Sequence, residues 1–245
     1  MNDPALIRQA AATALPIRSA FGSAGFDADL VPHIFAANDA SAIQDLHEHL
    51  FAEAPQGSFR HDSPDFFQRI LAGDGAILGL CTKEGALAAY SVLSLPKPDE
   101  FHYGRLIELP EACWPQIAQL EGVGVDPQRH GQGIQKWLGL WRMNTAAELG
   151  YRHLCATAAP MNFYSWRNLL SLGLVIRGLH SLYGGFLRYV LHHDIHASFA
   201  TTLDREVAVA DHPTQTELFA AGGKAWGWRG SPRPETLLVA MPGDN

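Results

Sequence analysis

Two glycines lie two residues apart in the stretch "VDPQRHGQGIQKWL", between a valine-rich run and apolar residues at helical spacing. The first N–H groups of a helix have no partner inside it, and the helix dipole adds partial positive charge there. Without a β-carbon, Gly131 and Gly133 let an anion approach the backbone. The pattern therefore predicts a phosphate-binding turn between a strand and a helix. A plain strand-to-helix turn that contains glycines is the alternative.

The elements that position this turn alternate between strand and helix patterns, which predicts an α+β (mixed α/β) fold. Strands are expected at residues 31–37, 75–81, 86–95, 114–125, 152–159, 174–183 and 185–195. Helices are expected at residues 39–54, 63–73, 131–149 and 162–173. Ser63 before Pro64 is a typical helix start, and "TKEG" at residues 82–85 is typical of a hairpin turn.

This order of elements resembles the GCN5-related N-acetyltransferase (GNAT) family over residues 31–195. Two motifs carry the resemblance, "VDPQRHGQGIQ" and, about 30 residues later, "PMNFYSWRNLLSLGL". In the first, Val125 and Pro127 precede the glycine turn. In the second, Asn162, Ser165 and Gly173 stand at the matching places. The resemblance implies a central mixed, mostly antiparallel twisted sheet flanked by helices.

The resemblance also implies that the anion is the pyrophosphate of coenzyme A, with acetyl-CoA as co-substrate and no metal. The implied cofactor-binding residues are Val123, Gly124, Val125, His130, Gly131, Gln132, Gly133, Ile134, Gln135 and Asn162. Two of them depart from the family pattern, since His130 replaces a basic residue and Gln135 brings a longer side chain. A second register of the same glycines, starting at Gln128, fits the pattern less well because it shifts Pro127.

Acetylation of an amine requires loss of a proton, because a lysine-like amine of pKa about 10.4 is almost fully charged at pH 7. Glu121 is the candidate base, on a strand whose alternation places residues 119, 121, 123 and 125 on one face. Binding of a cation, or pairing with an arginine, is the alternative role for Glu121. Many members of the family protonate the departing thiolate with a tyrosine, but Leu169 occupies that place here. Tyr164, about one helical turn earlier, is therefore the candidate acid, and Tyr183 is a further candidate. The alternative for Tyr164 is a partly buried position in the core.

Residues 1–30 are expected to form an amino-terminal extension, residues 31–195 the GNAT-like domain, and residues 196–245 a packed βαββ-like extension. This tail is expected to cover a sheet edge or to roof the acceptor site. Histidines 47, 49, 192, 193 and 196 raise a metal site as an alternative. However, His47 and His49 point to different faces of the expected helix, and the other three lie at the end of an expected strand, where solvated histidines are ordinary.

The net charge of −7 without a basic stripe argues against nucleic acid and favours a small amine as partner. Three scattered cysteines and no long apolar run predict a cytoplasmic protein without membrane insertion. We therefore expect an N-acetyltransferase that acts on a small primary amine in a ternary complex, and a homodimer is compatible with this interpretation. A non-catalytic acyl-CoA sensor or a partner-binding module on the same fold are the alternatives.

Overall fold

The computed structural model describes residues 3–15, 29–199 and 201–242 of the 245-residue chain. The chain divides into two compact units. The first unit comprises residues up to Pro96 and residues 118–151, and the second comprises residues 97–117 and those from Arg152 onward. The glycine turn lies in the first unit and the Asn162 motif in the second.

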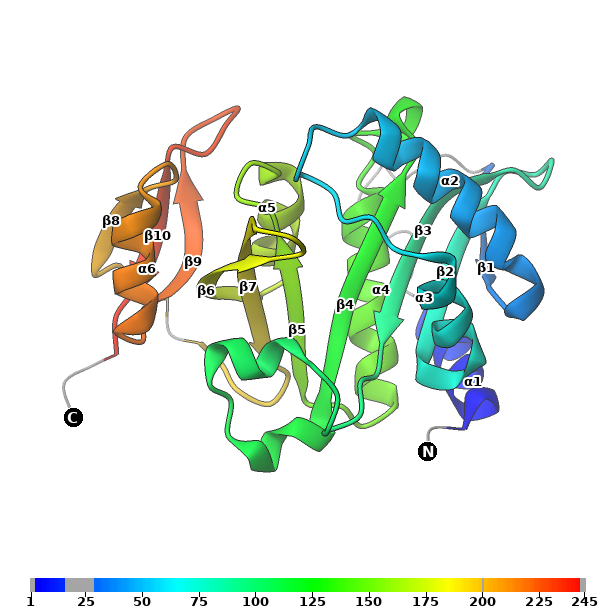
Figure 1. Cartoon of the computed structure of the whole chain (residues 1–245), viewed down its shortest axis with the longest axis horizontal. Helices are drawn as coiled ribbons and strands as arrows, with labels where there is room; N and C mark the ends of the chain where they lie inside the picture. Colours follow the sequence, from blue (N-terminus) through cyan, green and yellow to red (C-terminus); the bar gives the residue numbers. More distant parts are fainter. Residues whose placement is uncertain (1–2, 16–28, 200, 243–245) are drawn as a thin grey trace. The chain divides into compact units, whose positions relative to one another are not determined.

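The first unit is an antiparallel sheet with helices on its two faces (Figure 1). Its strands lie in the order β1 (Val31–Ile34), β2 (Gly75–Cys81), β3 (Leu87–Ser94) and β4 (Ile117–Val125). In the view of Figure 1, α2 (Ala40–Glu53) and α3 (Pro64–Arg69) lie in front of these strands. Behind the strands lies α4 (Ile134–Glu148), which packs against α1 (Pro4–Thr13). Short turns of helix lie at Ala37–Asp39, Ile70–Asp74 and Pro127–Arg129.

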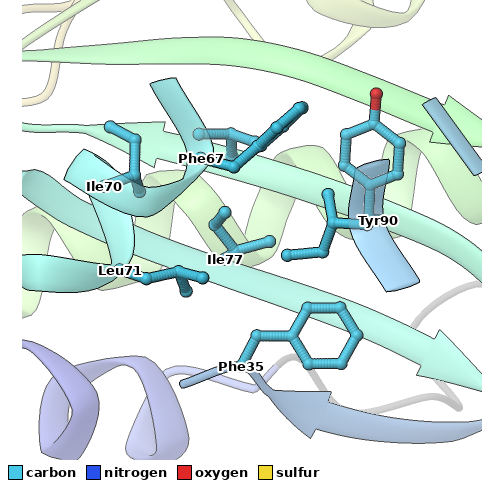
Figure 2. Packing of buried hydrophobic residues seen from close by; sticks show 8 residues of the cluster. Phe35, Phe67, Ile70, Leu71, Ile77 and Tyr90 are labelled. Carbon is cyan, nitrogen blue, oxygen red and sulfur yellow. The ribbon is translucent and has the colours of Figure 1, made fainter. Parts of the chain in front are cut away.

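The core between the front helices and the sheet combines aromatic and branched side chains (Figure 2). Phe67 from α3 and Tyr90 from β3 are fully buried, and their rings meet edge to face at 6.0 Å between centroids. The remaining buried members are Phe35, Ile43, Ile70, Leu71, Ile77 and Val92. This cluster fixes α2 and α3 on the sheet and so positions the segment between them, residues 54–63.

The second unit is also antiparallel, with strands in the order β5 (His153–Ala158), β7 (Phe186–Asp194), β6 (Val175–Leu182), β9 (Lys224–Arg229), β10 (Thr236–Ala240) and β8 (Arg205–Ala208). Its helices are α5 (Phe163–Ser171) and α6 (His212–Ala220). The carboxy-terminal strand β9 pairs with β6 at Ile176 and Ala225. The expected βαββ order of the tail is therefore present, and it continues the sheet at the β6 edge.

Residues 97–117, which connect β3 to β4, pack on β5, β6 and β7. They form two 3₁₀ helices, η4 (Tyr103–Ile107) and η5 (Glu111–Gln116). Tyr103, Ile107 and Leu109 from this segment are buried with Cys155 and Val190. No helix was expected in this connection, and the strand expected from residue 114 begins only at Ile117.

The mixed α+β fold and its mostly antiparallel sheet are confirmed. Ser63 caps α3 as expected, since its Oγ accepts a hydrogen bond from the Phe66 N–H with Pro64 in the first turn. The helix α1 was not expected, although Asp3 before Pro4 gives the same signal and Asp3 caps it. Residues 1–2 and 16–28 of the expected extension lie outside the described residues, and the domain bounds stay a prediction. No helix in the described part of the chain is long and apolar enough to cross a membrane.

Phe67→Ala should lower the free energy of unfolding by about 3–5 kcal/mol, because it opens a cavity in the core of the first unit. Phe66→Ala is the matched control, since Phe66 is the adjacent residue on α3 and is only partly buried. Chemical denaturation of both variants checks this. Equal losses for the two would show that α3 does not present Phe67 to the core.

Candidate active site

The glycine turn after β4 opens the amino terminus of α4. The Asp126 carboxylate accepts a hydrogen bond from the Gln128 N–H at 2.9 Å and so folds the chain after the strand. Gly131 and Gly133 both have left-handed backbones, with φ of 80° and 75°. A β-carbon at either position would meet nothing within 4 Å. Glycine is therefore required here by the backbone angle, and the space beside both residues is open.

The amino terminus of α4 has no side-chain cap. Gly133 is the capping residue, and the first helical hydrogen bond runs from the Trp137 N–H to the Gly133 carbonyl at 3.0 Å. The first turn holds Lys136 and no acidic residue. Since the leading N–H groups of a helix have no partner within it, this end offers donors and positive charge to an anion.

Two basic side chains of the turn, Arg129 and His130, bind other groups of the protein. Arg129 makes a two-fold contact with the Asp29 carboxylate, with N–O distances of 3.0 and 3.4 Å. The ring of His130 donates from Nε2 to the Val125 carbonyl at 3.1 Å. His130 therefore braces the end of β4, and any anion at this turn depends mainly on the backbone. The Oε1 atom of Gln132 is buried without a hydrogen-bond partner in the described part of the chain.

A β-bulge interrupts β4 between Leu120 and Val123. Ser91 pairs with Val123, whereas Leu93 pairs with Leu120, so the register shifts by one residue between them. A bulge places an extra residue on one strand and reverses the alternation beyond it.

The alternation expected for β4 is therefore wrong beyond Glu121. The Gln119 and Glu121 side chains contact each other on one face of β4. Gly122 and Gly124 share that face, since β-carbons there would meet Asp62 and Tyr90 respectively. Val123 and Val125 consequently lie on the opposite face.

A buried arginine of α4 holds the bulged strand. Arg142 Nη1 donates to the Glu121 carbonyl at 2.7 Å, and the arginine is almost fully buried. Burial lowers the Arg142 pKa to about 9, partly offset by the Glu121 charge. Arg142 thus supplies a side-chain donor to the backbone of the strand at the bulge.

The Glu121 carboxylate is held from two sides. Arg60 Nη1 approaches Oε2 at 2.9 Å, and Gln119 Nε2 donates to Oε1 at 2.9 Å. The Glu121 side chain is only 6% exposed. The same Arg60 guanidinium pairs with Oδ1 of Asp62, whose side chain is 7% exposed. One arginine therefore bridges two buried carboxylates; we call these three residues the Arg60 cluster.

Burial and the nearby Glu121 charge raise the Asp62 pKa to about 6, although Arg60 opposes the shift. The segment that carries Asp62 is fixed by His47 of α2. The Asp62 N–H donates to His47 Nε2 at 2.8 Å, and His47 Nδ1 lies 2.6 Å from the Tyr90 hydroxyl. Burial lowers the His47 pKa to about 4, so the ring is neutral at pH 7. Because Nε2 accepts, the proton lies on Nδ1, and the Tyr90 oxygen accepts it.

The other expected site residues lie in the second unit. Asn162 caps α5, since its Oδ1 accepts a hydrogen bond from the Ser165 N–H at 3.2 Å. Tyr164 is 67% exposed, so the core position considered for it is wrong. Leu169 is buried on the same helix. Tyr183 has a left-handed backbone and its hydroxyl lies 2.6 Å from that of Tyr103.

Sequence reasoning missed the partners of Glu121. Arg60 and Asp62 lie in an irregular segment without a motif, so no spacing linked them to β4. His47 did carry a signal, because it lies four residues after Ile43 on the apolar stripe of α2. A buried histidine on such a stripe needs polar partners, and these turn out to be Asp62 and Tyr90.

No family model and no curated protein matches the chain. Solved structures do match it. The acetyltransferase yncA from Salmonella typhimurium, described as putative and solved with acetyl-CoA, is 14% identical, with a TM-score of 0.53 over 71% of this chain and 99% of that one. A GNAT superfamily phosphinothricin acetyltransferase from Sinorhizobium meliloti with bound acetyl-CoA is 15% identical, with a TM-score of 0.51 over 68% and 88%.

Diaminobutyrate acetyltransferase EctA from Paenibacillus lautus, in complex with L-2,4-diaminobutyric acid and coenzyme A, is 17% identical, with a TM-score of 0.51 over 72% and 100%. At these identities the likeness concerns the fold. The chain has the fold of the GNAT acetyltransferases.

The raised Asp62 pKa predicts how Asp62→Asn changes stability with pH. The folded pKa of about 6 exceeds the ordinary value of 3.8, so the cost of ionising Asp62 in the folded protein is absent below pH 3.8, grows between pH 3.8 and pH 6, and is complete above about pH 6. The stability of Asp62→Asn relative to the wild type should therefore improve by on the order of 2–3 kcal/mol between pH 4 and pH 7.5.

Urea unfolding across this pH range measures the difference. Asp45→Asn, which removes an exposed carboxylate of α2, controls for the loss of one negative charge. A constant difference between Asp62→Asn and the wild type at all pH values would show that Asp62 ionises normally.

Proposed function

We propose that this protein transfers the acetyl group of acetyl-CoA to the primary amine of a small molecule. The observation that carries the proposal is the uncapped amino terminus of α4 behind Gly131 and Gly133, in a chain with the GNAT fold. An anion at this turn would meet backbone donors, and no β-carbon would obstruct it at Gly131 or Gly133. The fit of the turn to a pyrophosphate therefore rests on backbone geometry.

In this proposal the coenzyme A pyrophosphate binds the backbone of residues 130–135. The end of β4, from Val123 to Val125, lines the path of the cofactor toward Glu121. Asn162 shapes the second motif as the cap of α5. Tyr164, as an exposed tyrosine on α5, is the proposed donor of a proton to the departing thiolate.

The acceptor is proposed to be a cation in its resting form, since the Arg60 cluster has two carboxylates and one guanidinium. The amine nitrogen attacks the thioester carbonyl carbon, a C–N bond forms, and the C–S bond breaks. The nitrogen loses two protons overall: one restores the coenzyme A thiol and the other leaves through a protein carboxylate to water. Cys155, whose pKa burial raises to about 12, is a poor nucleophile, which supports direct attack over an acetyl-enzyme.

Acetyl-CoA or free coenzyme A should raise the melting temperature, because a ligand that binds only the folded state stabilises it. Gly133→Asp should abolish this rise by placing a side chain and a negative charge in the open space. Gly85→Asp is the matched control, since Gly85 has φ of 91° and nothing within 4 Å of its β-carbon position. Thermal shift assays with coenzyme A compare the two variants.

Gly85→Asp should strain the backbone to a similar extent, because both glycines have a left-handed backbone, but it should keep the rise in melting temperature that coenzyme A causes. If folded Gly133→Asp responds to coenzyme A as the wild type does, the turn is not the cofactor site. A chain that binds coenzyme A but releases no thiol with any amine would instead be an acyl-CoA sensor.

Glu121→Gln should raise mainly the KM for the amine, because Arg60 and Gln119 already engage its carboxylate and leave it an anchoring role. Loss of uniform binding changes KM and leaves kcat nearly constant. Steady-state kinetics on an accepted amine separate this from base catalysis. A fall in kcat of about 10²-fold or more at unchanged KM would make Glu121 the base instead.

A further inference from the structure

The carboxy-terminal strands join the second unit beside a bulge in β6. The register of β6 against β7 shifts between Ile176 and Gly178, so Arg177 is the extra residue on β6. A bulge leaves its extra residue without a cross-strand partner and redirects the side chain. On the other edge of β6, Ile176 pairs with Ala225 of β9. The antiparallel register therefore places Arg177 opposite Lys224, the residue before Ala225.

Arg177 and Lys224 are two partly buried cations without a counter-ion. Neither side chain makes an ion pair or a hydrogen bond to any residue that the structure describes. The Lys224 ammonium lies 5.2 Å from the centre of the Phe199 ring, which covers it on one side. Burial lowers the pKa of both groups, and the charge of Arg177 lowers the Lys224 pKa further. The two cations are thus close enough to repel each other.

The ionisable groups around this pair do not neutralise it. Glu108, at the end of η4, acts on the charge of Arg177, but it is exposed and makes no ion pair with it in the described part of the chain. Asp194 is held by Arg152 in a two-fold contact, with both N–O distances at 2.8 Å. Burial and the charge of Arg177 lower the His192 pKa to about 3, so this ring is neutral at pH 7 and adds no charge.

The pair is unfavourable as it stands, because like charges directly opposite each other on two strands destabilise a sheet. Partial burial increases this cost, since water solvates the charges less. Local conflicts of this kind in a folded chain are typical of functional positions. An anion that lies between the two side chains would remove the conflict.

The donors favour a phosphate group over a carboxylate. A guanidinium offers N–H groups in a planar fork, and an ammonium offers three further donors. A phosphate dianion matches two positive charges and has enough oxygens for both donors. A single carboxylate would leave one of the two charges uncompensated.

We propose that Arg177 and Lys224 form a binding site for a phosphate dianion where β9 joins β6. The anion accepts hydrogen bonds from the guanidinium and the ammonium and offsets their repulsion. Both residues belong to the second unit, whereas the glycine turn belongs to the first. The inference is independent of the proposed acetyl transfer.

The first test is calorimetric titration with inorganic phosphate at pH 7.5 in a zwitterionic buffer. The wild type should bind phosphate saturably, and Arg177→Met and Lys224→Met should each weaken this binding at least tenfold. Arg205→Met is the matched control, since it removes an exposed arginine of β8 in the same unit, and it should leave the binding unchanged. Equal binding by Arg177→Met and the wild type, or no binding by the wild type, would overturn the inference.

The glycine turn is itself proposed to bind a phosphate, so the titration is repeated with Gly133→Asp. This variant should retain the binding that Arg177→Met removes. Loss of all phosphate binding in folded Gly133→Asp would assign the anion to the turn and would contradict the site on β6. Glucose 6-phosphate then distinguishes a site that accepts phosphate monoesters from one that accepts only the free ion. Equal affinity for succinate would show that the phosphate group is not recognised, which also contradicts the inference.

The second test uses melting temperatures. Without phosphate, Lys224→Met should melt at a higher temperature than the wild type, because it removes the repulsion. Phosphate should raise the melting temperature of the wild type more than that of Lys224→Met, since a ligand stabilises the state that binds it. Any rise from the glycine turn is common to both proteins and cancels in this difference.

Sodium chloride at equal ionic strength controls for screening of the two charges. It should raise the wild-type melting temperature less than phosphate does. Equal rises in chloride and phosphate would show that screening alone acts on the pair. That result, or equal responses of Lys224→Met and the wild type to phosphate, would overturn the site.

Discussion

The bridge of Arg60 between Asp62 and Glu121 is the interaction on which the candidate active site depends. Two carboxylates that are each nearly buried repel one another, and burial of either charge without a partner is costly. The guanidinium can face both because the segment between α2 and α3 lies against β4 at the bulge. His47 fixes the same segment through the Asp62 N–H, and the core around Phe67 and Tyr90 fixes α2 and α3.

The bulge in β4 links this cluster to the glycine turn. The bulge reverses the side-chain alternation, so that Glu121, Gly122 and Gly124 share one face of β4. A β-carbon on Gly122 would contact Asp62 Oδ2 at 3.3 Å, and one on Gly124 would meet the Tyr90 ring at 2.3 Å, so the two glycines let these side chains approach the strand. From the same strand the chain turns through Gly131 and Gly133 into α4, whose Arg142 returns to the Glu121 carbonyl. Strand, turn and helix therefore form one closed set of contacts.

Much of the fold could be predicted because its signals are local. Ser63 before Pro64, the turn at residues 82–85 and the glycines at 131 and 133 each specify backbone geometry within a few residues. The bulge could not be predicted, since it arises from the register of β3 against β4 and leaves no local mark. Arg60 and Asp62 were missed for the same reason: their roles come from contacts about 60 residues away along the chain, which periodicity does not report. The two short helical turns η4 and η5 were not expected, because they are too short to show helical periodicity and prolines interrupt their sequence.

Acetyl transfer from acetyl-CoA directly to a small amine is tested by the product balance of one reaction. The purified chain is incubated with acetyl-CoA and each amine of a broad panel, and released thiol and amine mass are followed together. We expect at least one amine to gain an acetyl group in equimolar amount with coenzyme A thiol, with no acetyl group left on the protein. Thiol release at the uncatalysed rate with every amine, by a folded protein, would contradict it.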